Sequence, residues 1–110
     1  KTKIIELKNK KISEIIIDPK ELNVNADKFE NLVGNDAKFN AEKMIDIFRG
    51  EDNDFSKAVC LNAAAGLIIN GNHQSFADAY NNAREHILSK KVIKHLEKIQ
   101  NDWKYSWKDN

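Results

Sequence analysis

The chain opens with two isoleucine-rich runs that are separated by the polar segment Lys-Asn-Lys-Lys. β-Branched residues favour strands and a short polar segment with asparagine favours a turn, so the pattern predicts a hairpin that pairs Ile4–Leu7 with Ile12–Ile17. Pro19 is expected to end the second strand. Because a two-stranded hairpin alone is marginal in water, we expect these strands to belong to a larger sheet, although the sequence shows no convincing further strand.

Helical spacing of apolar residues dominates the rest of the chain. A loop with a short helical turn leads to Asp36, which is expected to cap a helix that Gly50 ends. A second helix is expected to start near Asp54 or Ser56 and to stop at Asn70-Gly71, a third follows at once, and a fourth starts near Ser89, with a tail from Trp103 that is expected to fray. The expected apolar stripes are Ala37, Ala41, Met44, Ile47 and Phe48; Ala58, Leu61, Ala65 and Ile68; Phe76, Ala79, Tyr80, Ala83 and Ile87; and Val92, Leu96, Ile99 and Trp103. By itself the chain is therefore an α+β piece, with one β-hairpin followed by three to four helices.

Small residues are concentrated in Ala63–Gly66, in the second predicted helix. Phosphate-binding loops put their glycines before a helix, whereas Gly66 and Gly71 lie within or after one, so a close approach by a neighbouring element is the favoured interpretation. On that helix, Asn62 shares a face with Ala58, Ala65 and Gly66. It is expected to be partly buried, either as a structural cross-link or, less favoured, as a ligand contact.

Composition limits the function classes. With 110 residues, 41% apolar and 32% charged residues and a net charge of +1, the chain suits one globular domain and not a polyanion-binding tail. The single cysteine excludes an internal disulfide, which favours a reducing, cytoplasmic setting. No apolar run is long enough to span a bilayer, so no membrane partner is expected. The chain also begins at Lys1 and not at methionine, which suggests processing or a longer parent chain.

The candidate chemistry is weak at each position. Cys60 lies among apolar residues and is expected to be an inert buried thiol and not a nucleophile. The histidines are too scattered to form a ligand set, and Glu51–Asp54 is better explained by helix capping than by a cation site. Lysines and tryptophans near the C-terminus are better explained as a solvated face than as a nucleic-acid site. The histidines are His73, His86 and His95, and the tryptophans are Trp103 and Trp107. No catalytic, substrate-binding or metal-binding residue is assigned.

Three blocks of sequence change this picture: Thr2–Leu7 with Ile17–Pro19, Gly34–Asp36 with Asn40-Ala41, and Ala58–Leu67. Their order and spacing resemble those of the C-terminal third of the anthranilate phosphoribosyltransferase family, in glycosyltransferase family 3. The family's Thr-Lys-Val-Ala-Glu-Leu strand and Leu-Asp-Pro turn are matched by Thr2–Leu7 and Ile17–Pro19. Its Gly-Gly-Asp helix start with an Asn-Ala pair is matched by Gly34–Asp36 and Asn40-Ala41, and its Ala-Val-Leu-Leu-Asn-Ala-Ala-Ala-Ala-Leu segment by Ala58–Leu67. The resemblance extends to about Gln100. The departures are Asn35 for glycine, Cys60 for leucine, Gly66 for alanine, and a tail, Asn101–Asn110, that does not align.

The resemblance implies that residues 1–110 are the C-terminal portion of an α/β domain of the nucleoside phosphorylase-like type. It implies a magnesium-dependent transfer of phosphoribosyl from phosphoribosyl pyrophosphate to anthranilate, in tryptophan biosynthesis. The family's pyrophosphate loop, its Lys-His-Gly-Asn segment, its metal-binding Asp-Glu pair and its anthranilate-site arginine have no match in this chain, so the chain alone is expected to be inactive. It also implies a homodimer for the full-length protein, through a helical N-terminal domain outside this chain. A non-catalytic relative that acts as a binding module, for instance for nucleic acid through Trp103 and Trp107, is the alternative.

Overall fold

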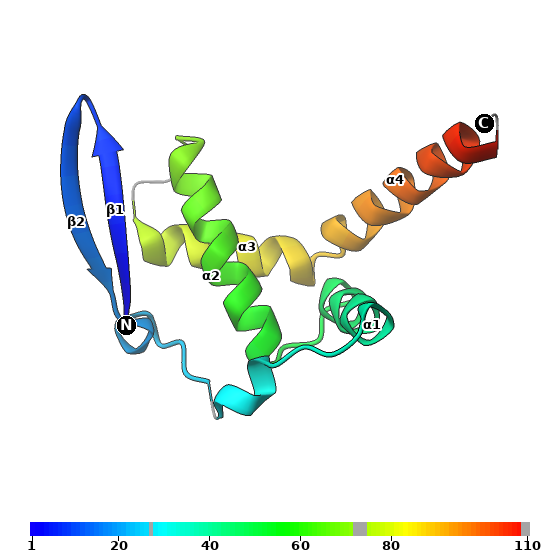
Figure 1. Cartoon of the computed structure of the whole chain (residues 1–110), viewed down its shortest axis with the longest axis horizontal. Coiled ribbons are helices and arrows are strands. Elements are labelled where there is room, and N and C mark those ends of the chain that lie inside the picture. Colours follow the sequence, from blue (N-terminus) through cyan, green and yellow to red (C-terminus); the bar gives the residue numbers. More distant parts are fainter. Residues whose placement is uncertain (27, 72–74, 109–110) are drawn as a thin grey trace.

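A β-hairpin stands at one end of the molecule and a long helix projects from the other, with three helices between them (Figure 1). This computed structural model describes residues 1–26, 28–71 and 75–108, and the side chains of these residues as far as Trp103. Within these ranges, no helix is long and apolar enough to cross a membrane.

The hairpin forms because its turn residues accept a left-handed backbone. Strands β1 (Thr2–Lys8) and β2 (Lys11–Ile17) pair antiparallel, with Leu7 opposite Ile12. The turn residues Asn9 and Lys10 have φ angles of 52° and 62°, as a two-residue turn of type I′ requires. The predicted hairpin is confirmed, and in the described part of the chain the sheet contains only these two strands.

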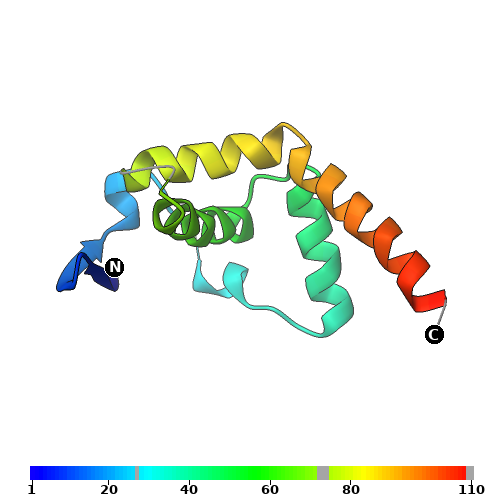
Figure 2. The same cartoon turned by 90° about the horizontal axis from the view of Figure 1, so that it is seen from above.

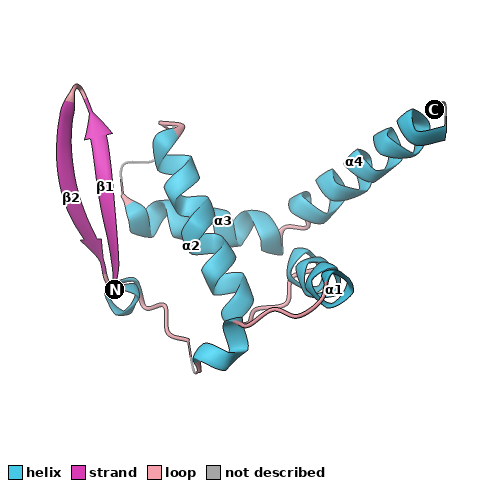
Figure 3. Ribbon diagram, viewed as in Figure 1, coloured by secondary structure: helices cyan, strands magenta, loops and turns pink. Residues whose placement is uncertain are grey.

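Two short 3₁₀ turns and helix α1 follow the hairpin (Figure 3). The turns are η1 (Pro19–Leu22) and η2 (Phe29–Leu32), and α1 spans Ala37–Phe48. Asp36 caps α1 as predicted, because its carboxylate accepts a 2.8 Å hydrogen bond from the Phe39 N–H. Gly50 ends this segment with a φ of 103°, a conformation that favours glycine. Of the predicted α1 stripe, only Ile47 is fully buried, whereas Ala37, Ala41 and Met44 are exposed.

The core lies mainly between α2 (Asp54–Ile69) and α3 (Phe76–Leu88), which cross closely (Figures 1 and 2). The predicted α3 stripe is confirmed, since four of its members are buried and Phe76 is half-buried. The fully buried apolar residues of the core are Val24, Ile47, Cys60, Ala64, Ala79, Tyr80, Ala83 and Ile87. The buried alanines and the cysteine of α2 and α3 are small, which allows the two helices to pack closely, and larger side chains such as Tyr80 and Ile87 complete the core.

The predicted apolar stripe of α2 is half-buried, whereas the fully buried apolar residues of that helix are Cys60 and Ala64. The predicted residues Ala58, Leu61 and Ala65 are half-buried and lie toward the hairpin. Apolar residues surround much of α2, so spacing alone did not identify the face that α3 covers. The expected close approach holds at Ala64, which is fully buried, and fails at Gly66, where an added Cβ meets no atom within 4 Å.

Helix α4 (Lys91–Lys108) leaves the body of the molecule (Figures 1 and 2). It begins after Lys90, whose φ is 67°, because the expected start Ser89 instead caps the end of α3. Its first apolar residues, Val92, Ile93 and Leu96, are half-buried, whereas Trp103 is 56% exposed. The helix continues to Lys108, so the expected fraying from Trp103 is not seen up to that residue.

Candidate functional site

The acidic segment before α2 forms connections within the fold. The Asp52 carboxylate pairs with Arg84 of α3, with 2.5 Å between Oδ2 and Nη2. The buried Asp54 carboxylate accepts a 2.9 Å hydrogen bond from the Asn31 amide and lies 3.1 Å from the Lys57 ammonium. These carboxylates therefore join three separate segments of the chain.

The N-terminus of α2 is capped by the amide of Asn53 and not by a neighbouring carboxylate. Asn53 Oδ1 accepts from the Ser56 N–H at 3.0 Å, and Ser56 Oγ accepts from the Asn53 N–H at 2.9 Å. This reciprocal pair is a capping box. The predicted capping role of Glu51–Asp54 is thus confirmed for the segment, with Asn53 as the residue responsible.

The magnesium ion that the family resemblance implies does not fit the residues described. In residues 1–26, 28–71 and 75–108, no group of three or more histidine, cysteine, aspartate or glutamate side chains could hold a metal ion. Asp52 and Asp54 are engaged with Arg84, Asn31 and Lys57, whose cationic or amide groups compete with a divalent cation. No catalytic step through magnesium follows from this part of the chain.

Cys60 is buried, with 2% of its surface exposed. Burial raises the pKa of its thiol, and the charge of Arg84 lowers it to a smaller extent. Because the thiolate is the reactive form and burial disfavours it, the surroundings of Cys60 favour the interpretation of an inert thiol over that of a nucleophile. The sequence showed no basic neighbour except Lys57, and Arg84 approaches only because α3 packs across α2.

The remaining candidates do not come together. His86 and His95 are exposed on different helices, and His73 lies outside the described residues. Trp103 is exposed on α4, and the side chain of Trp107 lies outside the described part.

Asn62 was expected to be partly buried and to link elements, and this was wrong. It is exposed, and its amide donates a 2.9 Å hydrogen bond to the Ala58 carbonyl of its own helix. The close packing of α3 covers another face of α2. Gly71 has a φ of 81° and follows the helix, as its predicted role as a stop requires.

The outer face of the hairpin carries large apolar side chains that are exposed to solvent. Ile5, Leu7 and Ile12 are 60%, 71% and 75% exposed, and Ile16 is 51% exposed. Because alternate residues of a strand point to opposite faces, these four side chains share one face. Their polar neighbours there are Lys3 and Glu14, which form an ion pair of 3.3 Å. We name these four apolar residues the outer hairpin face.

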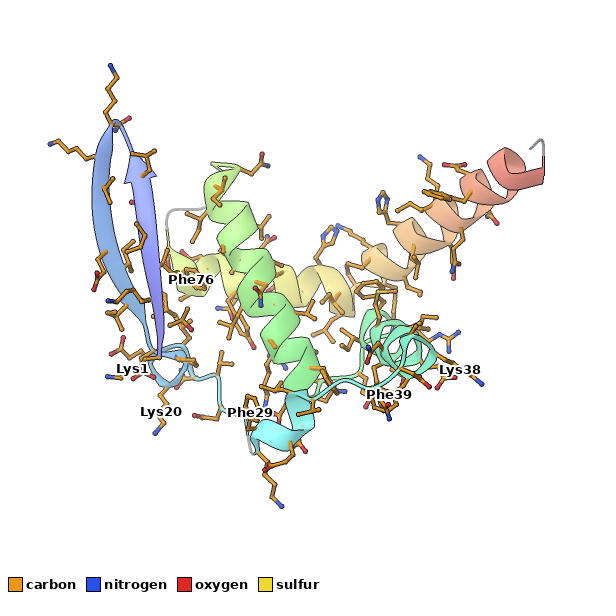
Figure 4. The ribbon with its side chains drawn as sticks, viewed as in Figure 1. Lys1, Lys20, Phe29, Lys38, Phe39 and Phe76 are labelled. Atoms are coloured by element: carbon orange, nitrogen blue, oxygen red, sulfur yellow. The ribbon has the colours of Figure 1, made fainter. Side chains whose placement is uncertain are left out.

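The opposite, inner face of the hairpin lies toward α2 and the start of α3, where Phe76 is seen near the strands (Figure 4). Thr2, Ile4 and Ile17 line a cavity of about 300 Å³ there. Across it lie Ala58, Leu61 and Ala65, three residues of the apolar stripe predicted for α2. Strands with apolar residues on both faces are typical of sheets covered on both sides.

Comparisons with known proteins agree with the family resemblance found in the sequence. The model of the glycosyl transferase family, a/b domain, matches residues 1–92. The chain is 65% identical over 101 residues to the anthranilate phosphoribosyltransferase of Pelagibacter ubique (strain HTCC1062). The aligned residues make up 92% of this chain and 31% of that protein. It is 34% identical over 99 residues to the anthranilate phosphoribosyltransferase of Methanobrevibacter smithii, which covers 90% of this chain and 30% of the relative. No solved structure matches significantly.

The chain therefore spans less than a third of the length of these two relatives. The match over residues 1–92 covers both strands and helices α1, α2 and α3, and it ends at the start of α4. The chain belongs to the glycosyl transferase family, by its a/b domain.

Proposed function

We propose that this chain forms the C-terminal part of the a/b domain of an anthranilate phosphoribosyltransferase. That enzyme transfers the phosphoribosyl group from phosphoribosyl pyrophosphate to the amine of anthranilate and releases pyrophosphate, with Mg²⁺ as the cofactor. The observation that carries the proposal is the 65% identity over 92% of the chain to the enzyme of Pelagibacter ubique. A reducing, cytoplasmic setting goes with this activity.

The proposed contribution of these residues is structural. Catalysis of this transfer needs groups that hold pyrophosphate and metal. The carboxylates before α2 are engaged in ion pairs and hydrogen bonds, and the Cys60 thiol is buried. The chain would supply a hairpin for the domain's sheet and helices to cover it, and the remaining part of the enzyme would supply the reacting groups.

The outer hairpin face supports the proposal that this chain is one structural part of a larger domain. Exposure of four large apolar side chains on one face of a two-stranded sheet is unfavourable, at about 25 cal/mol per Å² of apolar surface. A layer that covers them would remove this cost. In the proposed complete enzyme, the outer hairpin face is an interior surface.

The activity test uses a chimera in which this chain replaces the matching third of the Pelagibacter ubique enzyme. With phosphoribosyl pyrophosphate and Mg²⁺, the chimera is expected to consume anthranilate, followed by the loss of its fluorescence. The 110-residue chain alone is expected to consume none. Turnover by the isolated chain, or a folded chimera without turnover, would contradict the proposal.

A second test asks whether the outer hairpin face is interior. Ile12→Lys should make the isolated chain more soluble and less prone to self-association, because it places a charge on an exposed apolar face. The same change in the chimera should lower its thermal stability and activity, because it buries a charge. Lys10→Ala in the turn is the matched control. An unchanged chimera with Ile12→Lys would show that this face is solvent-exposed in the enzyme.

A further inference from the structure

A polar cavity lies between the end of η1, the start of α2 and one side of α3. Its volume is about 330 Å³, which is within the lower range of small-molecule sites. Its lining residues include Asn23, Asp52, Lys57, Tyr80, Asn81 and Arg84. None of the roles assigned above uses this cavity.

Tyr80 is the unusual member of the lining, because it is buried and yet its hydroxyl has no hydrogen-bond partner among the residues that the structure describes. Only 7% of its surface is exposed, and no hydrogen bond from the hydroxyl is found among the described residues. In the same part of the chain, no fully enclosed side-chain nitrogen or oxygen lacks a partner. Because the Tyr80 hydroxyl has no partner there, it is not among the fully enclosed atoms and must be partly accessible. Tyr80 lines this cavity and also a smaller one of about 10 Å³ beside Cys60.

The charged residues that affect the pKa of Tyr80 are also residues that line the cavity. Burial raises the pKa of Tyr80, the neighbouring Cys60 and Asp52 raise it further, and Arg84 and Lys57 lower it. Arg84, Asp52 and Lys57 are also lining residues, so the tyrosine hydroxyl is near the charged wall of the cavity. A hydrogen bond from a phenol O–H to an anionic acceptor is stronger than one between two neutral groups.

Several hydrogen-bond donors in this wall have no partner among the described residues. Arg84 has five N–H donors, and the hydrogen bond found for it, to Asp52, uses one. The side-chain amides of Asn23 and Asn81 also line the cavity, and no hydrogen bond from either is found in the described part. A ligand with several acceptor oxygens would match this set.

The charge balance selects among such ligands. The ionised lining residues are Lys57 and Arg84 against Asp52 and Glu21, so the charges of the wall cancel. A phosphate dianion would bring two uncompensated negative charges, whereas a carboxylate brings one and matches the planar fork of the guanidinium.

We propose that this cavity is a binding site for a small monocarboxylate, held by the Arg84 guanidinium and the Tyr80 hydroxyl, with the amides of Asn23 and Asn81 beside them. This inference goes beyond the proposed transferase activity and does not depend on it. The site lies away from the outer hairpin face and takes a ligand even where the chain supplies no catalytic group.

The test is a titration of the ¹⁵N-labelled 110-residue chain with sodium acetate, followed by NMR of the Arg84 Nε–H and the Asn81 side-chain amide. Sodium chloride keeps the ionic strength constant, and sodium phosphate is titrated in parallel. Saturable acetate shifts at both groups, absent with chloride and weaker with phosphate, are the expected result. Shifts that follow ionic strength alone, or saturation with phosphate and not acetate, would overturn the proposal.

Tyr80→Phe removes the hydroxyl and keeps the ring in the core. It should raise the acetate dissociation constant by about tenfold, as expected for a lost hydrogen bond to a charged group. Lys94→Gln, on the exposed side of α4, is the matched control and should leave the titration unchanged. Because circular dichroism confirms folding of each variant separately, an unchanged constant in folded Tyr80→Phe would also refute the site. The readout is binding and not turnover, so its failure leaves the transferase proposal intact.

Discussion

The Asn31 side-chain amide donates a 2.9 Å hydrogen bond to the buried carboxylate of Asp54, across 23 residues of sequence. This bond attaches η2 to the first turn of α2. It also supplies part of the hydrogen bonding that a buried carboxylate needs, together with the Lys57 ammonium.

Asn31→Ala should therefore lower the free energy of unfolding by about 1–3 kcal/mol, because the buried Asp54 carboxylate loses a hydrogen-bond donor. Urea denaturation followed by circular dichroism measures this. Asn25→Ala changes an exposed asparagine in the segment before η2 and should alter stability by less than about 0.5 kcal/mol. Equal effects of the two changes would show that the Asn31–Asp54 bond contributes nothing specific.

The two small residues Ala64 and Gly66 should respond in opposite directions. Ala64 is completely buried in the core, so Ala64→Val should destabilise the fold by about 1–3 kcal/mol through overpacking. Gly66 is in the same helix with space around it, so Gly66→Ala should stabilise by about 0.5–1 kcal/mol through helix propensity. Thermal unfolding gives both signs. Destabilisation by Gly66→Ala would mean that a neighbour covers this position.

Much of this fold could be predicted from local patterns. The hairpin, the Asp36 cap, the stop at Asn70-Gly71 and the α3 stripe all depend on residues close in sequence, and the structure confirms them. Local propensity and side-chain capping act over a few residues, so the sequence displays them directly.

Which faces are covered could not be predicted, because that depends on elements distant in sequence. Asn62 and Gly66 seemed buried because α2 is apolar around most of its circumference, and only the position of α3 shows that Cys60 and Ala64 face the core. The Asp52–Arg84 ion pair joins residues that are 32 positions apart in the sequence, so no local pattern predicts it.

The capping box of α2 makes a further prediction. Asn53→Ala removes the acceptor of the Ser56 N–H and should cost about 1 kcal/mol of stability. Asn62→Ala is the control, because Asn62 is exposed and bonds only to the Ala58 carbonyl of its own helix among the contacts described. It should change stability by less than about 0.5 kcal/mol. If Asn53→Ala costs no more than Asn62→Ala, the cap does not stabilise the protein.

Alkaline pH should weaken the fold through Cys60. Burial raises the pKa of this thiol above its ordinary 9.0, so the folded state keeps a proton that the unfolded state loses. The stability contributed by this group is complete below the unfolded pKa and is lost as pH rises through the folded one. Urea midpoints should therefore decrease between neutral pH and about pH 10, and the decrease should be smaller in Cys60→Ala.

The same burial makes the thiol a reporter of unfolding. A thiol reagent at neutral pH should modify Cys60 only as fast as the protein opens, and urea should accelerate the reaction. Rapid modification without denaturant, or an identical alkaline decrease in Cys60→Ala, would contradict the burial of this side chain.

The tight turn at Asn9 and Lys10 has a consequence for the order of folding. Because β1 and β2 are joined by two residues, their pairing needs only local chain closure and is expected within microseconds, before distant segments meet. The α2–α3 pair is likewise local in sequence. A larger sheet would then grow by adding strands to a template that already exists, with Leu7 and Ile12 held in register by the turn and the outer strand edges still open.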